Sequence, residues 1–246
     1  MARIFWFRRD RRLQDNLALN GCAQASKLDG DAVVIPAFWL NQTEFESMSG
    51  IRQHSLSESL KALDQSIGDA LEIINSSDPN EFVKFAKAKG VKFVHATESF
   101  DPEGIAEQRV LQSKLAAAGI SLLLEDSNYA VKPGTVAKPT DGSAYRVYTP
   151  FYKAWFQLGW QFPAKLTQGF SWQARKGASK IPAPTKSAPF SVKAGEQFAL
   201  ETFKRFKKRA LSNYSENRNR ADLSGTSHLS HALAHGEIHP RTLLAT

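Results

Sequence analysis

The sequence predicts an α/β fold: a doubly wound, five-stranded parallel sheet, then a long proline-rich linker and the start of an all-α domain. Three observations support this prediction. Apolar runs alternate with helix-like stretches up to residue 130, seven of the eleven prolines fall between residues 131 and 195, and helical periodicity returns from Gly195. We therefore divide the chain into residues 1–130, 131–194 and 195–246.

Five apolar, β-branched or aromatic runs predict the strands: Arg3–Phe7, Ala32–Trp39, Leu71–Ile74, Val91–His95 and Ile120–Leu124. The helices are expected between them: Asn16–Lys27, Arg52–Ile67, Asn80–Lys89 and Pro102–Ala118. Strands that alternate with helices form βαβ units, so the sheet should be parallel and covered on both faces. Gly90 and Gly119 precede strands as C-cap glycines. The pattern is complete within residues 1–130, which we expect to fold independently.

The linker should contain neither a continuous helix nor a central strand, because its prolines interrupt both. Aromatic side chains between Tyr145 and Trp160 should order its first part, whereas Gln173–Lys193 is polar and should be looser. After the linker, apolar residues recur at helical spacing: Phe198, Leu200, Phe203, Phe206 and Leu211.

The net charge of +8 is distributed unevenly. Residues 1–130 hold 14 Lys+Arg against 18 Asp+Glu, whereas residues 131–246 hold 18 against 6. A basic second half indicates either a polyanionic partner or a solubilising surface, and the cluster Lys204–Arg209 slightly favours nucleic acid. The single cysteine, Cys22, excludes an intramolecular disulfide, and no apolar run could span a bilayer. We expect a cytoplasmic monomer without a membrane partner.

The loop after the first strand is rich in charge. Residues 8–16 contain four arginines and two aspartates, and no glycine-rich phosphate-binding fingerprint occurs in the chain. The arginines and aspartates could form an internal ion-pair network that locks the loop against the sheet. They could equally form an anion site.

A second candidate site lies near the end of the sequence. Thr226 and Ser227 follow Gly225 and precede an apolar run, which is an N-cap signature. Gly236 and Pro240 should end this helix and begin the next. Two capped helices with a solvated basic face explain the pattern; the alternative is an anion site flanked by arginines. The arginines in question are Arg218, Arg220 and Arg241.

Four histidines occur close together, at positions 228, 231, 235 and 239. The first three would share one face of a helix, a geometry that can hold a metal. Among carboxylates and cysteines only Glu237 is near, and it lies off that face. We therefore expect no metal site and interpret the histidines as helix surface.

Four motif blocks, taken together, resemble the DNA photolyase and cryptochrome family. They are Trp6–Asn16 with Ala18-Leu19, Tyr145–Trp155, Tyr214 with Arg218 and Gly225–Ser230, and Gly236–Arg241. The resemblance covers essentially the whole chain. It implies an α/β antenna domain, a linker that wraps around it, and a helical domain that holds FAD and receives DNA. Only the beginning of that helical domain would be present, so we expect a C-terminally truncated chain.

The resemblance also implies residue roles. FAD would be contacted by Tyr214, Thr226, Ser227, His228, Leu229 and Ser230, and a DNA phosphate by Arg218. The family usually has Arg at the position of His228 and Pro at the position of His231. No catalytic residue is assigned, nor is any tryptophan assigned to flavin reduction. Without the rest of a helical domain, five apolar residues should lack packing partners: Leu229, Leu233, Ile238, Leu243 and Leu244.

The function that this resemblance implies is light-driven repair of cyclobutane pyrimidine dimers in DNA through reduced FAD. This chain alone should be inactive. A cryptochrome-type blue-light receptor and a stand-alone α/β chromophore-binding module are the alternatives. The family's antenna domain usually carries a second chromophore. Residues 101–107 lack the Asn-Glu pair of the folate-binding version, which favours a deazaflavin without assigning its residues.

Overall fold

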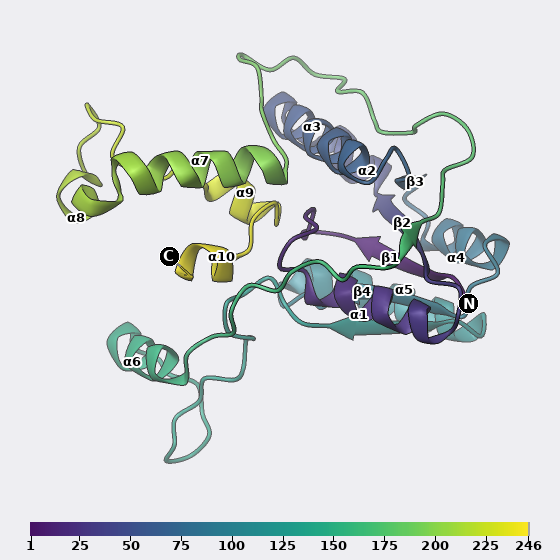
Figure 1. The fold of residues 1–246 in the computed structure, drawn as a ribbon, viewed down its shortest axis with the longest axis horizontal. Coiled ribbons are helices and arrows are strands. Elements are labelled where there is room, and N and C mark those ends of the chain that lie inside the picture. Colours follow the sequence, from purple (N-terminus) through teal and green to yellow (C-terminus); the bar gives the residue numbers. More distant parts are fainter. Residues whose placement is uncertain (246) are drawn as a thin grey trace.

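The computed structural model describes residues 1–245, and its centre is a parallel sheet (Figure 1). The five main strands are β1 (Arg3–Phe7), β2 (Val33–Leu40), β3 (Glu72–Asn75), β4 (Phe93–Thr97) and β5 (Ser121–Glu125). Their order is β3-β2-β1-β4-β5 and all pairs are parallel. The strand order reverses between β1 and β4, which confirms the predicted doubly wound topology.

Helices cover both faces of the sheet because alternate residues of its strands point to opposite sides. Phe5 and Phe7 pack with α1 (Leu17–Leu28) and α3 (Gly50–Ser66), whereas Ile4 and Trp6 pack with α4 (Pro79–Ala88) and α5 (Pro102–Ala117). The helix starts follow ordinary capping rules, since side chains of Asn16, Asp78 and Asp101 accept hydrogen bonds from the first turns of α1, α4 and α5. The short α2 (Gln42–Ser47) was not predicted from the sequence.

The prediction that the linker contains no helix was wrong. Tyr148–Leu158 form α6, in which Pro150 occupies the first turn. A proline is tolerated there because its missing N–H would have no partner within the helix. Further along, Ser171–Trp172 form β6, which pairs in parallel with the start of β2 and makes the sheet six-stranded. Figure 1 shows α6 projecting away from the sheet.

The expectation that Gln173–Lys193 is loosely held was also wrong, because this part of the linker is bonded to the sheet domain. Arg175 Nη1 donates to the Asp64 carboxylate at 2.9 Å and to the carbonyl of Leu71 at 2.8 Å. Gln53 Oε1 accepts from the backbone amide of Thr185. Four apolar linker residues pack on the core beneath α1 and α3: Leu166, Phe170, Trp172 and Ile181.

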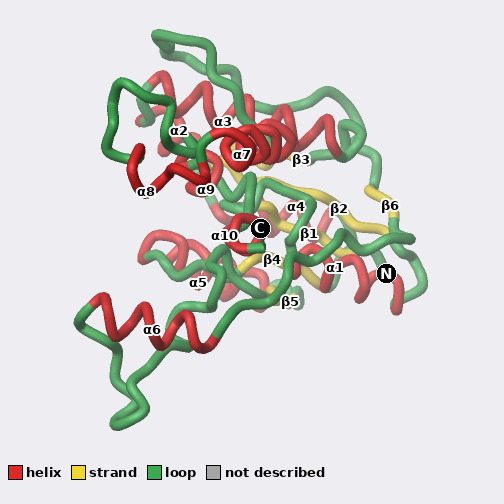
Figure 2. Tube along the Cα trace, turned by 60° about the vertical axis from the view of Figure 1, so that its left-hand side comes forward, coloured by secondary structure: helices red, strands yellow, loops and turns green. Residues whose placement is uncertain are grey.

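The chain after the linker is helical. It forms α7 (Glu196–Arg209), a 3₁₀ turn (Leu211–Asn213), α8 (Tyr214–Asn217), α9 (Ser230–Ala234) and α10 (Pro240–Leu244). A small core unites α7 with the last segments, and it buries Leu229 and Ile238, contrary to the expectation that they lack partners. Leu233 and Leu244 are exposed. Figure 2 shows α10 close to the loops at one end of the sheet. Within residues 1–245, no helix combines the length and apolarity that a membrane span requires.

Candidate functional site

The carboxyl end of the sheet is where a fold of this topology binds ligands, at the point where the strand order reverses. In this protein Arg8 fills that crevice between β1 and β4. Its guanidinium donates to Glu107 Oε2 at 2.7 Å, to Gln108 Oε1 at 3.1 Å and to the carbonyl of Gly104 at 2.8 Å. It also lies over the Trp6 ring, 4.5 Å from the ring centroid. A ligand at this point would have to displace a buried, paired cation.

The rest of the loop after β1 is an internal polar network, the first of the two readings that the sequence left open. Asp10 is fully buried and accepts from the Arg8 amide at 2.7 Å and from Thr97 Oγ1 at 2.6 Å. Arg12 is buried and donates to the carbonyls of Asp15 and Gly236. These bonds fix the loop against both the sheet and the end of the chain.

The loop after β1, the loop after β5 and the segment Gly236–Arg241 meet in what we call the tail junction. Arg241 Nη2 lies 3.0 Å from Asp15 Oδ1 and 2.9 Å from Asp126 Oδ2. His239 Nε2 lies 3.0 Å from the carbonyl of Ser127, and its Nδ1 lies 3.1 Å from Asp15. Arg241 is thus buried at 3% exposure and is not the free arginine that an anion site would need.

Several ionisable groups of the tail junction have shifted pKa values, among them Asp15 and His239. Burial raises the pKa of Asp15, but its contacts with His239, the Ala164 amide and Arg241 outweigh burial and lower the pKa overall. Burial is the main cause that lowers the pKa of His239, against the raising effect of Asp15. His239 is therefore neutral around pH 7, which agrees with its Nδ1 accepting from the Arg241 amide.

Gly236 is required where the tail meets the loop after β1. Its φ is +65°, and a Cβ built on it would stand 1.8 Å from the Arg9 carbonyl oxygen. Only glycine combines this backbone conformation with so close an approach. The sequence placed Gly236 correctly at a helix end, because α9 ends at Ala234 and Pro240 begins α10.

Beside the tail junction lies a cluster that we call the polar cluster: the buried Arg11 and Glu237 and the half-buried His231 and His235. Arg11 Nη2, His231 Nε2 and both Glu237 carboxylate oxygens are buried without a hydrogen-bond partner. Burial lowers the pKa of Arg11 to about 10, opposed by Glu237. Burial, together with the charge of Arg11, lowers the pKa of His235 to about 3. Sequence reasoning considered His231, His235 and Glu237 only as metal ligands and did not single out Arg11.

The shared helical face that could have held a metal does not form. His228 has a φ of +53° and precedes α9, so it cannot share a helical face with His231 and His235. Across residues 1–245 no three or more His, Cys, Asp or Glu side chains are arranged so that they could hold a metal ion. The predicted N-cap was also misplaced, since α9 begins at Ser230 without a side-chain cap.

Of the residues expected to contact FAD and DNA, Tyr214 and Arg218 belong to α8 and its C-terminal end, and Thr226–Ser230 lead into α9. Tyr214 is 39% exposed and its ring packs edge-on against Phe206 at 5.8 Å between centroids. Arg218 is exposed at the end of α8. Of Thr226–Ser230, only Leu229 is buried, so the hydroxyls of Thr226 and Ser230 face solvent. Gly225 packs against Asn217, which brings this segment beside α8.

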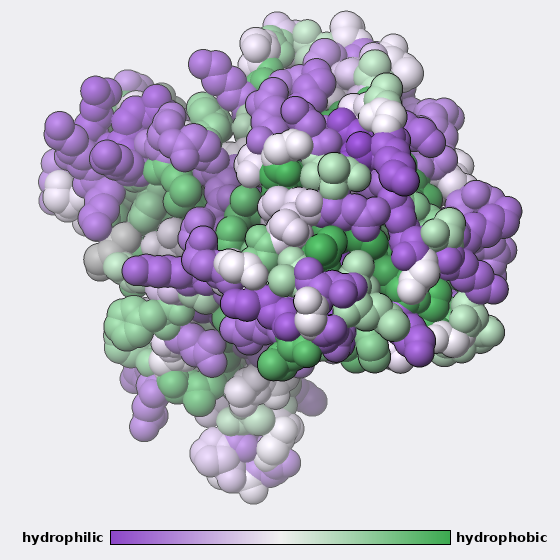
Figure 3. Space-filling view, turned by 45° about the vertical axis from the view of Figure 1, so that its right-hand side comes forward, coloured by the Kyte–Doolittle hydropathy of each residue, from purple (hydrophilic) through white to green (hydrophobic). Residues whose placement is uncertain are grey.

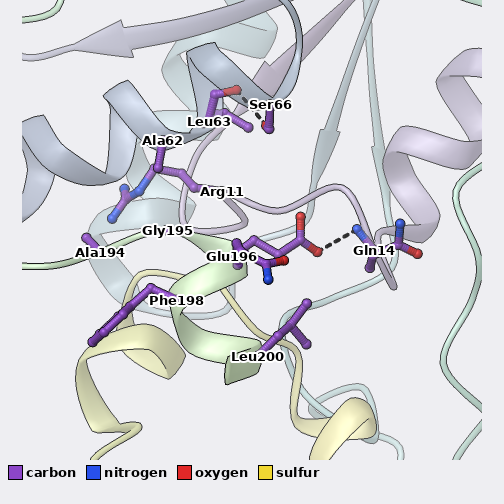
Figure 4. A pocket seen from close by; sticks show the side chains of 11 residues that line it. Arg11, Gln14, Ala62, Leu63, Ser66, Ala194, Gly195, Glu196, Phe198 and Leu200 are labelled. Atoms are coloured by element: carbon purple, nitrogen blue, oxygen red, sulfur yellow. Dashed lines mark hydrogen bonds between the residues drawn. The ribbon is translucent and has the colours of Figure 1, made fainter. Parts of the chain in front are cut away.

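A cleft of about 330 Å³ separates α3 from the start of α7 (Figure 4). Glu196 closes one side of it, accepting from the backbone amides of Leu13 and Gln14 at 2.8 Å each. Burial raises the pKa of Glu196 despite these two hydrogen bonds. Arg11 and Gln14 also line the cleft, whereas Tyr214 and Thr226–Ser230 do not. The predicted flavin-contacting residues therefore lie outside this cleft, on an exposed part of the surface that we call the open wall.

Comparison with known proteins agrees with this architecture. The sequence model described as DNA photolyase matches residues 3–168. A deoxyribodipyrimidine photo-lyase from Agrobacterium fabrum is 30% identical over 96% of this chain and 51% of its own length. An uncharacterized 31.6 kDa protein from Synechococcus is 27% identical over 98% of this chain and 87% of its own length.

The crystal structure of a bacterial class III photolyase from Agrobacterium tumefaciens superposes with a TM-score of 0.81 at 27% identity, covering 99% of this chain and 52% of that one. The chain thus spans about half the length of the photolyases that it matches. The family model covers well over half of the present sequence. The chain belongs to the DNA photolyase family.

Proposed function

We propose that this chain supplies the sheet domain, the linker and the first flavin-contacting segment of a photolyase that repairs pyrimidine dimers in DNA. The observation that carries the proposal is the alignment of nearly the whole chain with a photolyase at 30% identity. A match over 96% of the chain includes the helical segments after residue 195 as well as the sheet domain. A stand-alone α/β module would not need those segments.

The residues present fit one end of FAD. Thr226, Ser230 and the ring of Tyr214 are exposed, so they can contact a phosphate-bearing ligand. A ligand of this size usually has ~70–90% of its surface buried, which an open wall does not provide. Once bound, the reduced flavin would supply the electron for dimer splitting. Arg218 would contact a DNA phosphate, which positions the strand without reading its sequence.

The sheet domain would carry the second pigment of the family, and we propose a deazaflavin over a folate. The proposal rests on residues 101–107, where Asp101 caps the start of α5 through the Gly104 amide. No Asn-Glu pair is available in this segment. Arg8 fills the neighbouring crevice, so the pigment's residues stay unassigned.

A chimera tests the proposal. Residues 1–246 replace the matching first half of the Agrobacterium fabrum photo-lyase, and the purified protein is assayed for bound flavin and for dimer splitting under blue light. We expect both. The variant T226A/S230A should retain less flavin, whereas the control S212A/S215A, which alters exposed hydroxyls outside the segment, should not.

Each other outcome has a definite meaning. A folded chimera that binds flavin but repairs no dimers would overturn the repair function in favour of a blue-light receptor. Equal flavin retention by T226A/S230A and the control would overturn the assignment of the Thr226–Ser230 segment.

A further inference from the structure

The outer face of α7 carries an exposed cluster of cations that form no ion pair within residues 1–245. Residues 202–215 contain five Lys and Arg and no carboxylate. All five of these side chains are exposed. Among residues 1–245 the one polar side-chain partner of the cluster is the Thr202 hydroxyl, which accepts from Arg205 at 3.0 Å. These exposed cations form no ion pair with a carboxylate of residues 1–245, because Glu201, which lies on the same side of α7, accepts from Gln197 instead, so the cations are available to a polyanion.

Four of the five cations share one side of the helix. At 100° per residue, Lys204, Arg205, Lys208 and Arg209 fall opposite the stripe that contains Ala199 and Phe203. That stripe packs in the small core with Leu229, Ala232 and Ile238, so the cationic side faces away from the protein. We call these four residues the α7 basic face. Figure 3 shows hydrophilic side chains gathered at the α7–α8 end of the molecule, at its upper left.

We propose that the α7 basic face binds the phosphate backbone of duplex nucleic acid. Residues 204 and 208, like residues 205 and 209, stand about 6 Å apart along the helix axis, giving two short rows of positive charge on a convex surface. Backbone phosphates can be neutralised on such a surface without a pocket, because this contact reads charge and not sequence.

A membrane surface fits the same cations less well. A helix that lies on a lipid surface inserts its apolar side, and the apolar side of α7 is already occupied by α9 and the segment before α10. The contact between Phe206 and Tyr214 holds α8 beside the end of α7, which places the basic face near Arg218. That the polyanion is DNA rests on the proposed function. The contact between the α7 basic face and backbone phosphates would form without flavin and without a lesion in the DNA.

The test measures binding of a fluorescently labelled, undamaged duplex by anisotropy, in the dark and without flavin, over a series of salt concentrations. The variant K204Q/K208Q/R209Q is compared with K87Q/K92Q/R109Q, which removes the same residue types from exposed positions of the sheet domain. For the basic-face variant we expect binding at low salt to weaken tenfold or more. The slope of log K against log salt should fall in magnitude by about two to three, since each lost phosphate contact removes about 0.9. The sheet-domain variant should change little.

One further variant, a damaged duplex and anionic vesicles complete the design. K204R/K208R/R209K keeps the charges and should bind like the parent protein, which separates loss of charge from loss of fold. Damaged and undamaged duplexes should weaken equally. Anionic vesicles should bind weakly and without dependence on the α7 basic face. An unchanged salt slope in the basic-face variant, an equal loss in the sheet-domain variant, or equal dependence of vesicle binding on these residues would each overturn the proposal.

The two hypotheses can fail separately. If the chimera repairs dimers while the basic-face variant keeps its salt slope, only the inference about α7 is lost. If the slope falls as expected while the chimera neither holds flavin nor repairs, only the proposed photolyase function is lost.

Discussion

Removing the guanidinium of Arg241 should strongly destabilise the protein. In Arg241→Ala, the Asp15 carboxylate, which is 1% exposed, loses its cationic partner but keeps the Ala164 amide, which donates at 3.0 Å. Breaking a buried ion pair on one side typically costs ~3–5 kcal/mol. We expect a loss near the lower end, about 3 kcal/mol, because the hydrogen bond from the Ala164 amide remains and Asp126 is partly exposed. For a protein whose whole stability is ~5–15 kcal/mol this is a large fraction.

Urea unfolding followed by tryptophan fluorescence measures the effect. With a slope of ~3 kcal/mol/M, the midpoint should fall by about 1 M. Arg220→Ala is the matched control, because its ion pair with Asp222 is exposed on both sides, and it should shift the midpoint far less. Adding Asp15→Asn to Arg241→Ala should recover ~1–2 kcal/mol by removing the uncompensated charge. A loss in Arg241→Ala no larger than in Arg220→Ala, or strictly additive effects of the two changes, would refute the ion-pair argument.

Four further predictions concern the junction, the linker and the flavin. Gly236→Ala should lower the free energy of unfolding by about 2 kcal/mol or more, because an alanine there would have an unfavourable positive φ and would clash with the Arg9 carbonyl. Gly134→Ala is the control, since Gly134 has a φ of +85° but open space around it, and it should cost ~1 kcal/mol in the same urea assay. The pKa of His235 in the folded protein, about 3, lies below the ordinary value of ~6.5, so the unfolded chain takes up the proton first as the pH falls. The free energy of unfolding should therefore decrease below pH ~6.5, by ~2 kcal/mol at pH 5. His235→Phe should weaken this dependence of stability on pH. A fragment of residues 1–188 should unfold at higher urea than one of residues 1–130, because Trp172 and Arg175 stay in place; equal midpoints would contradict this. Residues 1–246 alone should retain no flavin after reconstitution with FAD, and stoichiometric flavin absorbance would count against the open-wall description of the Tyr214–Ser230 region.

The sheet was predictable because its evidence is local. The run Arg3–Phe7 is a strand in both the prediction and the structure, and the helix predicted to begin at Pro102 does begin there. In parallel sheets that are covered on both faces, strands are continuous apolar runs and are conspicuous in a sequence.

The helix α6 was missed because the prediction considered how many prolines the linker contains and not where each one lies. Pro150 is the third residue of α6, where it removes no helical hydrogen bond. The stacked rings of Tyr148, Tyr152 and Trp155 recur at helical spacing and were a usable signal.

The tail junction could not be predicted from local patterns. Asp15 and Arg241 are 226 residues apart, and each occurs in a charged segment that offers several equally plausible partners. Only the folded topology brings the loops after β1 and β5 to the same edge as Gly236–Arg241. For the same reason, Arg11 and Glu237 gave no sign in the sequence that they would be buried together.

The tail junction also bears on how the protein is made. A ribosome adds ~5–20 residues per second, so Arg241 follows Asp15 out of synthesis by about 10–45 seconds. During that interval the sheet can form, but the loops after β1 and β5 carry carboxylates that have no cation from the tail. The nascent sheet domain should therefore be less resistant to proteases before residues 236–241 are made than afterwards, and it should gain resistance once α10 has left the exit tunnel.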